Sequence, residues 1–147
     1  MPTIENFQGP YEFLSNFYPC KINYDGFNFA SVEHAFQAAK FRDYSKKFAI
    51  SKASSPGQAK RMGKDFGGLR TDWGEACLVV MYDLLKQKFN DPKLKKLLLA
   101  TVDAELQEGN RWGDAFWGMV GGQGLNNLGK LLMRVREELV TTREGGP

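Results

Sequence analysis

Cysteine and histidine are scarce in this chain of 147 residues, which has two cysteines and one histidine. Cys20 and Cys77 lie far apart and form no C-x-x-C pair, so we expect two reduced thiols rather than a disulfide framework. With His34 as the only imidazole, a histidine-rich metal site or a histidine-based catalytic triad is hard to build. We therefore expect neither a metal nor a cofactor, and an enzyme built on this sequence must move protons mainly with carboxylates.

Long apolar runs are also missing. The longest, Cys77–Tyr82 and Leu97–Ala100, are far shorter than the roughly 20 residues of a membrane span. The first residues lack the basic segment and apolar run of a signal peptide. The sequence therefore predicts a cytoplasmic protein that does not associate with a membrane.

The remaining composition is that of an ordinary folded protein. Hydrophobic residues make up 42% of the chain, charged residues 25%, and the net charge is +3. Such a chain buries enough apolar surface to offset its ordering entropy, which argues against intrinsic disorder. We expect a single domain over residues 1–140 and a flexible tail over residues 141–147.

Hydrophobic periodicity and capping residues predict a mainly helical α+β fold with a small N-terminal β region. Aromatics alternate with Asn, Gly and Pro between Phe7 and Phe29, and Asp25-Gly26 fits the turn of a short hairpin. Residues 103–120 are less regular and suit short strands. Helices are expected over residues 31–42, 43–53, 55–64, 71–89 and 90–99, and from Asn126 or Asn127 onward.

Positive charge is concentrated in one segment. Between Lys40 and Lys64 eight residues are basic and only Asp43 is acidic, whereas four acids accompany Arg111 between Thr101 and Gly118. The basic segment is suited to phosphates and is a candidate DNA contact. The alternative is that its side chains form the solvated faces of three helices. Arg61 and Lys64, three residues apart on one predicted helix face, have the spacing best suited to hold phosphate.

Two segments carry polar groups in patterns that packing alone does not explain. In S-V-E-H-A-F-Q-A-A-K, the residues Glu33, Gln37 and Lys40 form one polar line on a helix. Glu33 also lies in the first turn, where the helix dipole stabilises a carboxylate; the alternative is a surface glutamate that helps to cap the helix. The second segment, residues 108–118, combines acids, glycines and two Trp that can stack on a base. A Gly-rich loop over residues 121–129 follows and leads into a helix N-terminus, which favours anions.

Together these segments resemble the NADAR family, whose members are also described as YbiA-like. The resemblance runs from Glu5 to Glu137. It rests on F-L-S-N-F-Y, S-V-E-H-A-F-Q-A-A-K, A-K-R-M-G-K, L-R-x-D-W, L-L-A-T, E-G-N-x-W-x-D-x-F-W-G and G-x-G-x-N-x-L-G-x-L-L-M-x-x-R. Val102 stands where family members often have Gly, and Gln107 stands where an apolar residue is usual.

The resemblance implies an N-glycosidase, an enzyme that hydrolyses the bond between ribose C1′ and a base or amine. Such a bond breaks through an oxocarbenium-like state that a carboxylate stabilises. Glu33 and Asp114 are the expected catalytic residues: Glu33 would support the cation and orient water, and Asp114 would act on the leaving group or ribose hydroxyls, with the roles exchangeable. We expect the substrate to be bound by Asn16, Lys40, Arg61, Lys64, Trp73, Trp117 and Asn126. The helical spacing of Trp73 with other apolar residues fits a core residue equally well.

The expected substrate carries ADP-ribose or a phosphoribosyl group, either as a small molecule or linked to nucleic acid. ADP-ribosylated guanine, in DNA or as a nucleotide, is favoured by the basic segment. One alternative is a phosphorylated ribosylaminopyrimidine intermediate of riboflavin biosynthesis, which needs only one phosphate site. A second is a non-catalytic reader of ADP-ribose, which would keep the stacking Trp residues but would tolerate loss of Glu33.

Overall fold

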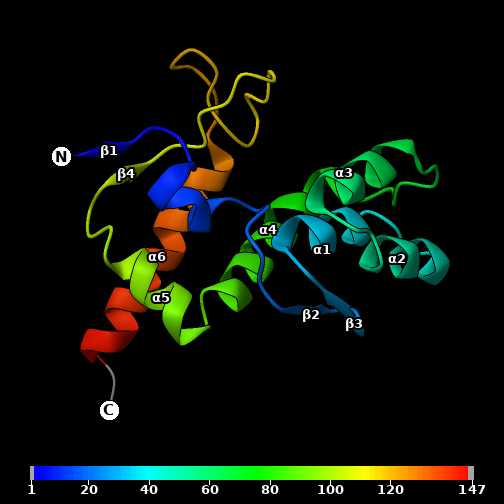
Figure 1. The fold of residues 1–147 in the computed structure, drawn as a ribbon, viewed down its shortest axis with the longest axis horizontal. Helices are drawn as coiled ribbons and strands as arrows, with labels where there is room; N and C mark the ends of the chain where they lie inside the picture. The colour runs from blue at the N-terminus through cyan, green and yellow to red at the C-terminus, as the bar shows by residue number, and fades with distance from the viewer. Residues whose placement is uncertain (1, 146–147) are drawn as a thin grey trace. The chain divides into compact units, whose positions relative to one another are not determined.

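The computed structural model describes residues 2–145, with side chains up to Thr142, and helices dominate it (Figure 1). The helices are η1 (a 3₁₀ helix, Gly9–Leu14), α1 (Val32–Ala39), α2 (Tyr44–Ser51), α3 (Pro56–Asp65), α4 (Trp73–Lys88), α5 (Pro92–Leu99) and α6 (Asn127–Gly145). The strands are β1 (Thr3–Ile4), β2 (Ile22–Tyr24), β3 (Phe27–Phe29) and β4 (Glu105–Leu106). The predicted class, mainly helical α+β, is confirmed.

Residues of the chain group into two compact units according to which residues contact each other. Unit 1 contains Met1–Ser15 and Phe89–Pro147, and unit 2 contains Asn16–Lys88. Unit 1 is therefore assembled from both ends of the sequence. The expected single domain over residues 1–140 and the flexibility of the tail stay predictions; helix α6 itself continues to Gly145.

Helix α1 is the element around which unit 2 is organised. It packs against α2, α3, α4 and the β2–β3 hairpin, and all eight of its residues are buried. Ser31 caps it, because Ser31 Oγ accepts the backbone N–H of His34 at 3.1 Å. The His34 ring lies 2.7 Å from Ser31 Oγ through Nδ1 and 3.1 Å from the Ala53 carbonyl through Nε2. Since a carbonyl only accepts, Nε2 donates and Nδ1 accepts, and the one histidine serves to fasten α1.

Unit 1 joins the start of the chain to its second half. Strand β1 pairs in parallel with β4, with Thr3 opposite Glu105 and Ile4 opposite Leu106. Helix α6 packs on β4 and on α5, and α5 also contacts η1. Sequence periodicity does not indicate so short a parallel pair. It also suggested β structure over Gly9–Leu14, where the chain forms the 3₁₀ helix η1.

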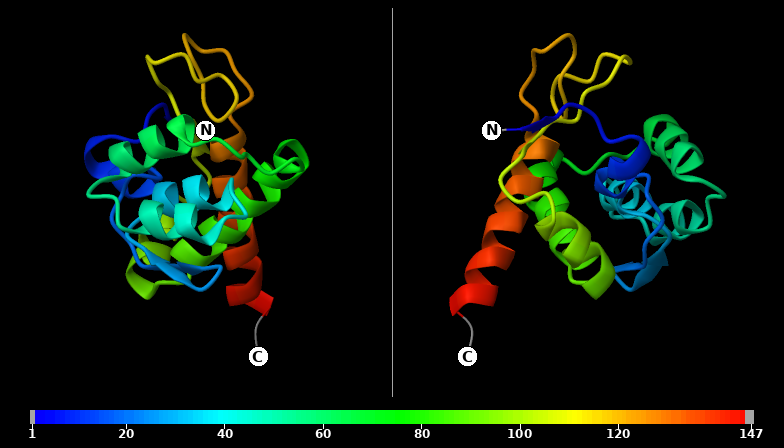
Figure 2. Two further views of the ribbon diagram at one scale, coloured as in Figure 1. Left: turned by 90° about the vertical axis from the view of Figure 1, so that its right-hand side faces the viewer. Right: turned by 60° about the vertical axis from the view of Figure 1, so that its left-hand side comes forward.

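Two loops, one after β4 and one before α6, run alongside each other in both views of Figure 2. A bridge between Gly109 and Met119 joins them. Glycine is needed at position 109 because a Cβ there would overlap the Glu5 carbonyl oxygen. Asp114 and Trp117, two of the predicted site residues, lie in these loops.

Among residues 2–145, no helix combines the length and apolar character that crossing a membrane requires. Cys20 and Cys77 form no disulfide.

Candidate functional site

Glu33 lies in the first turn of α1, and only 8% of its surface is exposed. Its backbone N–H donates to the Asn16 carbonyl at 3.0 Å. Its Oε2 accepts a hydrogen bond from Gln37 Nε2 at 2.7 Å, one turn further along the helix. The alternative of a surface glutamate is therefore wrong, and Ser31 caps the helix instead. Burying a carboxylate is costly unless its charge is used or compensated.

Asn16, from the F-L-S-N-F-Y motif, is held at the start of α1 by that same backbone bond to Glu33. Its side-chain Nδ2 points to Met81 Sδ at 3.5 Å. Its Oδ1 is buried and has no hydrogen-bond partner among the described residues. A buried amide oxygen left in this state is ready to accept a hydrogen bond from a ligand or a water molecule. Unit 2 thus brings two predicted site residues together.

Lys40 closes α1 at its C-terminal end and is half-buried. Burial lowers the pKa of Lys40, whereas the Glu33 carboxylate acts in the opposite direction and Lys60 lowers the pKa further. The ammonium group is therefore within electrostatic reach of Glu33. Within the predicted polar line, Glu33 and Gln37 are hydrogen-bonded to each other, and the charge of Glu33 acts on Lys40.

Half of the basic segment is engaged in contacts within unit 2. Arg42 pairs with Asp72 at 3.3 Å, and the buried Lys47 pairs with Asp25 at 2.8 Å. The Lys46 ammonium donates to the Gly67 carbonyl, and the Lys52 ammonium lies 5.5 Å from the centre of the Phe48 ring. By contrast, the exposed residues Arg61 and Lys64 on α3 have no ion-pair partner among the described residues.

Trp73 begins α4 and is half-buried, with its ring centre 5.0 Å from that of Phe36 on α1. The L-R-x-D-W motif explains how it is placed. Arg70 donates to the Ala39 carbonyl at the end of α1 at 3.3 Å, and its guanidinium binds Asp72 at 2.6 and 2.8 Å. Hydrogen bonds from Arg70 lower the pKa of Asp72 to about 2. Arg70 was not among the predicted site residues, although its motif was the signal that could have revealed it.

In unit 1, Asp114 organises a tight turn. Its Oδ1 accepts the backbone N–H groups of Phe116 at 3.1 Å and of Trp117 at 2.8 Å. Asn110 braces the turn, because its Oδ1 accepts the Asp114 N–H and its Nδ2 donates to the Asp114 carbonyl. Only Oδ1 serves the turn, because Asp114 Oδ2 has no hydrogen-bond partner among the described residues. The half-buried Trp117 ring meets Phe116 edge-on at 5.0 Å.

Asn126 is buried just before α6, with a φ of 51°. Its Oδ1 accepts the Glu108 N–H at 3.0 Å and its Nδ2 donates to the Leu106 carbonyl at 2.9 Å. Its amide therefore ties β4 and the following loop to the start of α6. The substrate contact expected of Asn126 stays a prediction, and in this structure its polar atoms serve the fold.

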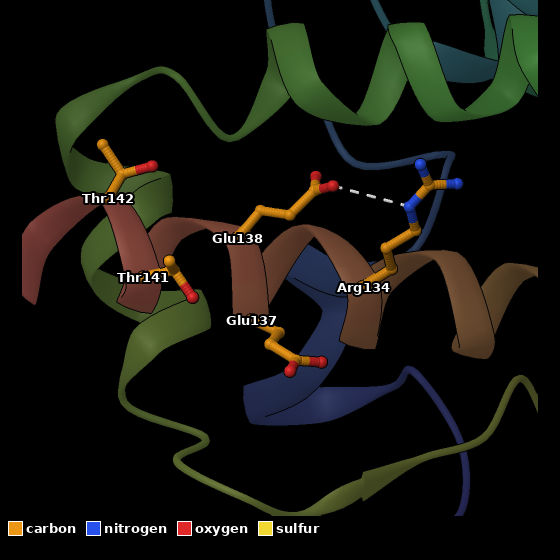
Figure 3. Close-up of a pocket in the computed structure, with 5 residues that line it drawn as sticks. All are labelled: Arg134, Glu137, Glu138, Thr141 and Thr142. Carbon is orange, nitrogen blue, oxygen red and sulfur yellow. Dashed lines mark ion pairs between the residues drawn. The ribbon is translucent and has the colours of Figure 1, made fainter. Parts of the chain in front are cut away.

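Three surface depressions in unit 1 include none of the predicted site residues. One, of about 1050 Å³, lies among the loops and includes Arg111 and the exposed Trp112. A second, of about 390 Å³, lies on α5, and a third, of about 400 Å³, lies along α6 (Figure 3). There Arg134 and Glu138 form an ion pair at 3.5 Å one turn apart.

The predicted residues thus form two sets. Unit 2 holds Asn16, Glu33, Lys40, Arg61, Lys64 and Trp73, and unit 1 holds Asp114, Trp117 and Asn126. That the two carboxylates serve the same ribose stays a prediction.

Comparison with known proteins identifies the family. The model of the NADAR domain matches residues 4–140, nearly the whole chain. The chain therefore belongs to the NADAR domain family.

Individual proteins similar to this chain add detail to the family match. The N-glycosidase YbiA of Escherichia coli is 43% identical over 143 residues, which cover 93% of this chain and 89% of that protein. The NMR structure of E. coli YbiA superimposes with a TM-score of 0.84 at 41% identity, over 97% of this chain and 89% of that one. A riboflavin biosynthesis protein of Vibrio vulnificus is 44% identical over 86% of this chain, which spans 35% of that longer protein.

Proposed function

We propose that this chain hydrolyses the C1′–N bond of a phosphorylated N-riboside. As a NADAR protein whose E. coli and Nostoc punctiforme relatives are named N-glycosidases and match over 89% and 86% of their lengths, it is a hydrolase acting on N-glycosyl bonds. One observation carries the proposal for its own residues: a buried carboxylate, Glu33, lies beside the Asn16 backbone and within electrostatic reach of Lys40.

In the proposed mechanism, Glu33 stabilises the positive charge that develops at C1′ and orients the attacking water. The unpartnered Asn16 Oδ1 accepts a hydrogen bond from that water or from a ribose hydroxyl. Asp114 Oδ2 assists the leaving group or the ribose hydroxyls, while Trp117 stacks on the base. Trp73, held against Phe36, forms the wall beside Glu33. Arg61 and Lys64 bind phosphate.

For the substrate, we propose first a ribosylaminopyrimidine phosphate. Arg42, Lys46, Lys47 and Lys52 are engaged with other groups of the protein, which supports one phosphate site rather than a long phosphate track. The name of the Vibrio relative, a riboflavin biosynthesis protein, agrees with this choice. ADP-ribosylated guanine is the second candidate, supported by the exposed pair Arg61 and Lys64.

We further propose that the protein acts in the cytoplasm. Cys20 and Cys77 form no disulfide, as is usual for proteins of reducing compartments.

The proposal is tested by measuring the base released from both substrates by chromatography. We expect Glu33→Gln to lower the rate at least about 100-fold, the usual scale for a group in general acid–base work. Circular dichroism would establish that the variant is folded. The matched control is Glu75→Gln, which makes the same change at an exposed position of α4 and should retain the activity of the unaltered protein.

A Glu33→Gln variant that keeps its rate would remove Glu33 from the mechanism. Tight binding of ADP-ribose, with no base released from either substrate, would instead favour a non-catalytic reader. Asp114→Asn is the suitable partner variant, because Asn retains the oxygen that accepts the Phe116 and Trp117 N–H groups.

A further inference from the structure

The two polar atoms of the Gln37 side-chain amide differ in their hydrogen bonding. Its Nε2 donates to Glu33 Oε2 at 2.7 Å, and the two residues are 4% and 8% exposed. An amide N–H can only donate, so it stabilises the ionised form of the carboxylate and fixes which oxygen it holds. The bond joins one turn of α1 to the next, so the helix itself sets the distance between the two groups.

The other end of the Gln37 amide is buried with no hydrogen-bond partner among the described residues. It lies against α3 at Gly63, where a Cβ would overlap Gln37 Oε1. Leaving a buried carbonyl oxygen without a hydrogen-bond partner is unfavourable. Methionine at position 37 would fill similar space without that cost. Packing alone therefore does not account for glutamine here, whereas its Nε2 donor does.

Titratable or charged side chains on α1 and on the elements packed against it include Tyr24 on β2, His34 and Lys40 on α1, Lys47 on α2, Lys60 on α3 and Cys77 on α4. His34 is bonded to Ser31 and Ala53, Lys47 to Asp25, and the Cys77 thiol to the Gly74 carbonyl. Lys40 acts on Glu33 through its charge.

We infer that Gln37 is a positioning residue that holds the Glu33 carboxylate ionised and in one orientation. Gly63, which has no Cβ, packs against the other end of the Gln37 amide. This inference rests on the proposed function of Glu33. In this role Gln37 acts on the reaction through Glu33. Gly63 contributes by admitting α3 close enough to prevent the amide from turning away.

The first test is Gln37→Met, which removes the donor and keeps the side-chain length. We expect kcat to fall about 10- to 100-fold with little change in KM, as for a misplaced catalytic group. In a separate titration of the free protein, followed by carboxyl ¹³C NMR, the apparent pKa of Glu33 should rise, because the ionised form has lost a hydrogen bond. If Gln37 only filled space, Gln37→Met would leave the pKa of Glu33 unchanged and would not lower kcat more than it raises KM.

The second test is Gln37→Glu, which has nearly the same shape and guards against a packing defect in the methionine variant. At neutral pH two carboxylates would repel and the donor would be absent. At lower pH the pair shares one proton, and the introduced carboxyl group, once protonated, can donate to Glu33. We therefore expect the activity of Gln37→Glu relative to Gln37→Met to rise as the pH falls.

The matched control is Gln58→Met on α3. Gln58 accepts hydrogen bonds from Ser54 and has none with Glu33, so the Glu33 pKa and the pH profile should not change. Unaltered kcat and an unaltered Glu33 pKa in Gln37→Met would overturn the inference. If the pKa rises but the unaltered protein releases no base from any substrate, the proposed function fails while the positioning role stands.

Discussion

Several residues of this chain occupy conformations or environments that their type normally avoids. Glu33 is buried, Gln37 keeps an unpartnered oxygen, and Val102 has a φ of 55°. The first two are linked to each other and to the proposed chemistry. Val102 is different, because it is 71% exposed and follows the end of α5. Its backbone N–H donates to the Leu99 carbonyl at 3.1 Å, a bond that glycine in the same conformation would also make.

Replacing Val102 with Gly should stabilise the protein. A left-handed backbone costs a residue with a Cβ roughly 1–2 kcal/mol, and a branched Cβ is among the worst cases. Glycine removes that strain but increases the conformational entropy of the unfolded chain, which offsets part of the stabilisation. We expect the free energy of unfolding, measured by urea denaturation, to rise by about 0.5–1 kcal/mol.

Val102→Ala is the control, because alanine keeps a Cβ and should recover less stability than glycine. A Val102→Gly variant less stable than the unaltered protein would show that the observed backbone conformation is not strained. The resemblance to the NADAR family had already marked this position as one where glycine is expected.

Helix starts are the elements that the sequence predicted best. Ser31, Asp43, Ser55 and Asp91 each accept a backbone N–H in the first turn of the helix that follows, and Pro56 and Pro92 begin two of these helices. These signals are local, because a capping side chain and its target lie within three residues. Long-range features were missed. Nothing in the separate segments indicates that β1 pairs with β4, or that Gly63 lies against Gln37.

The cap of α1 should matter more than a comparable cap elsewhere. Ser31→Ala removes the acceptor for the His34 N–H and also leaves His34 Nδ1 without its hydroxyl donor. We expect a loss of about 2 kcal/mol in the free energy of unfolding, the upper range for a cap. Ser55→Ala removes only the acceptor for the Gln58 N–H and should cost about 1 kcal/mol. Equal losses in thermal or urea unfolding would show that the bond to His34 contributes nothing.

At the scale of the whole molecule, the distribution of charge bears on the choice of substrate. The net charge is only +3, and four of the eight basic residues between Lys40 and Lys64 are bound within unit 2. This segment therefore offers fewer unengaged cations to a nucleic-acid backbone than its composition alone suggests. A single phosphate group, in contrast, needs only one or two cations.

Salt dependence should therefore separate the two substrates. We expect kcat/KM for the free ribosylaminopyrimidine phosphate to fall less than about 10-fold between about 50 and 200 mM salt, whereas a DNA-binding enzyme with many phosphate contacts loses about 1,000-fold or more. Lys64→Gln should lower kcat/KM and flatten its salt dependence. Lys52→Gln is the control and should change neither. A steep loss on an ADP-ribosylated oligonucleotide, with higher activity than on the free compound, would reverse the order of the two substrates.

The sequence by itself determined the helical class, the helix starts and the family, because periodicity, caps and ordered motifs are written in neighbouring residues. It also singled out Glu33 and Asp114. Tertiary structure decided what those residues do locally: Glu33 is buried and held by Gln37, Asp114 gives one oxygen to a turn, and Asn126 is bonded to the backbone of β4 and its loop. Burial and hydrogen-bond partners depend on segments that are distant in the chain, so they exist only once it has folded.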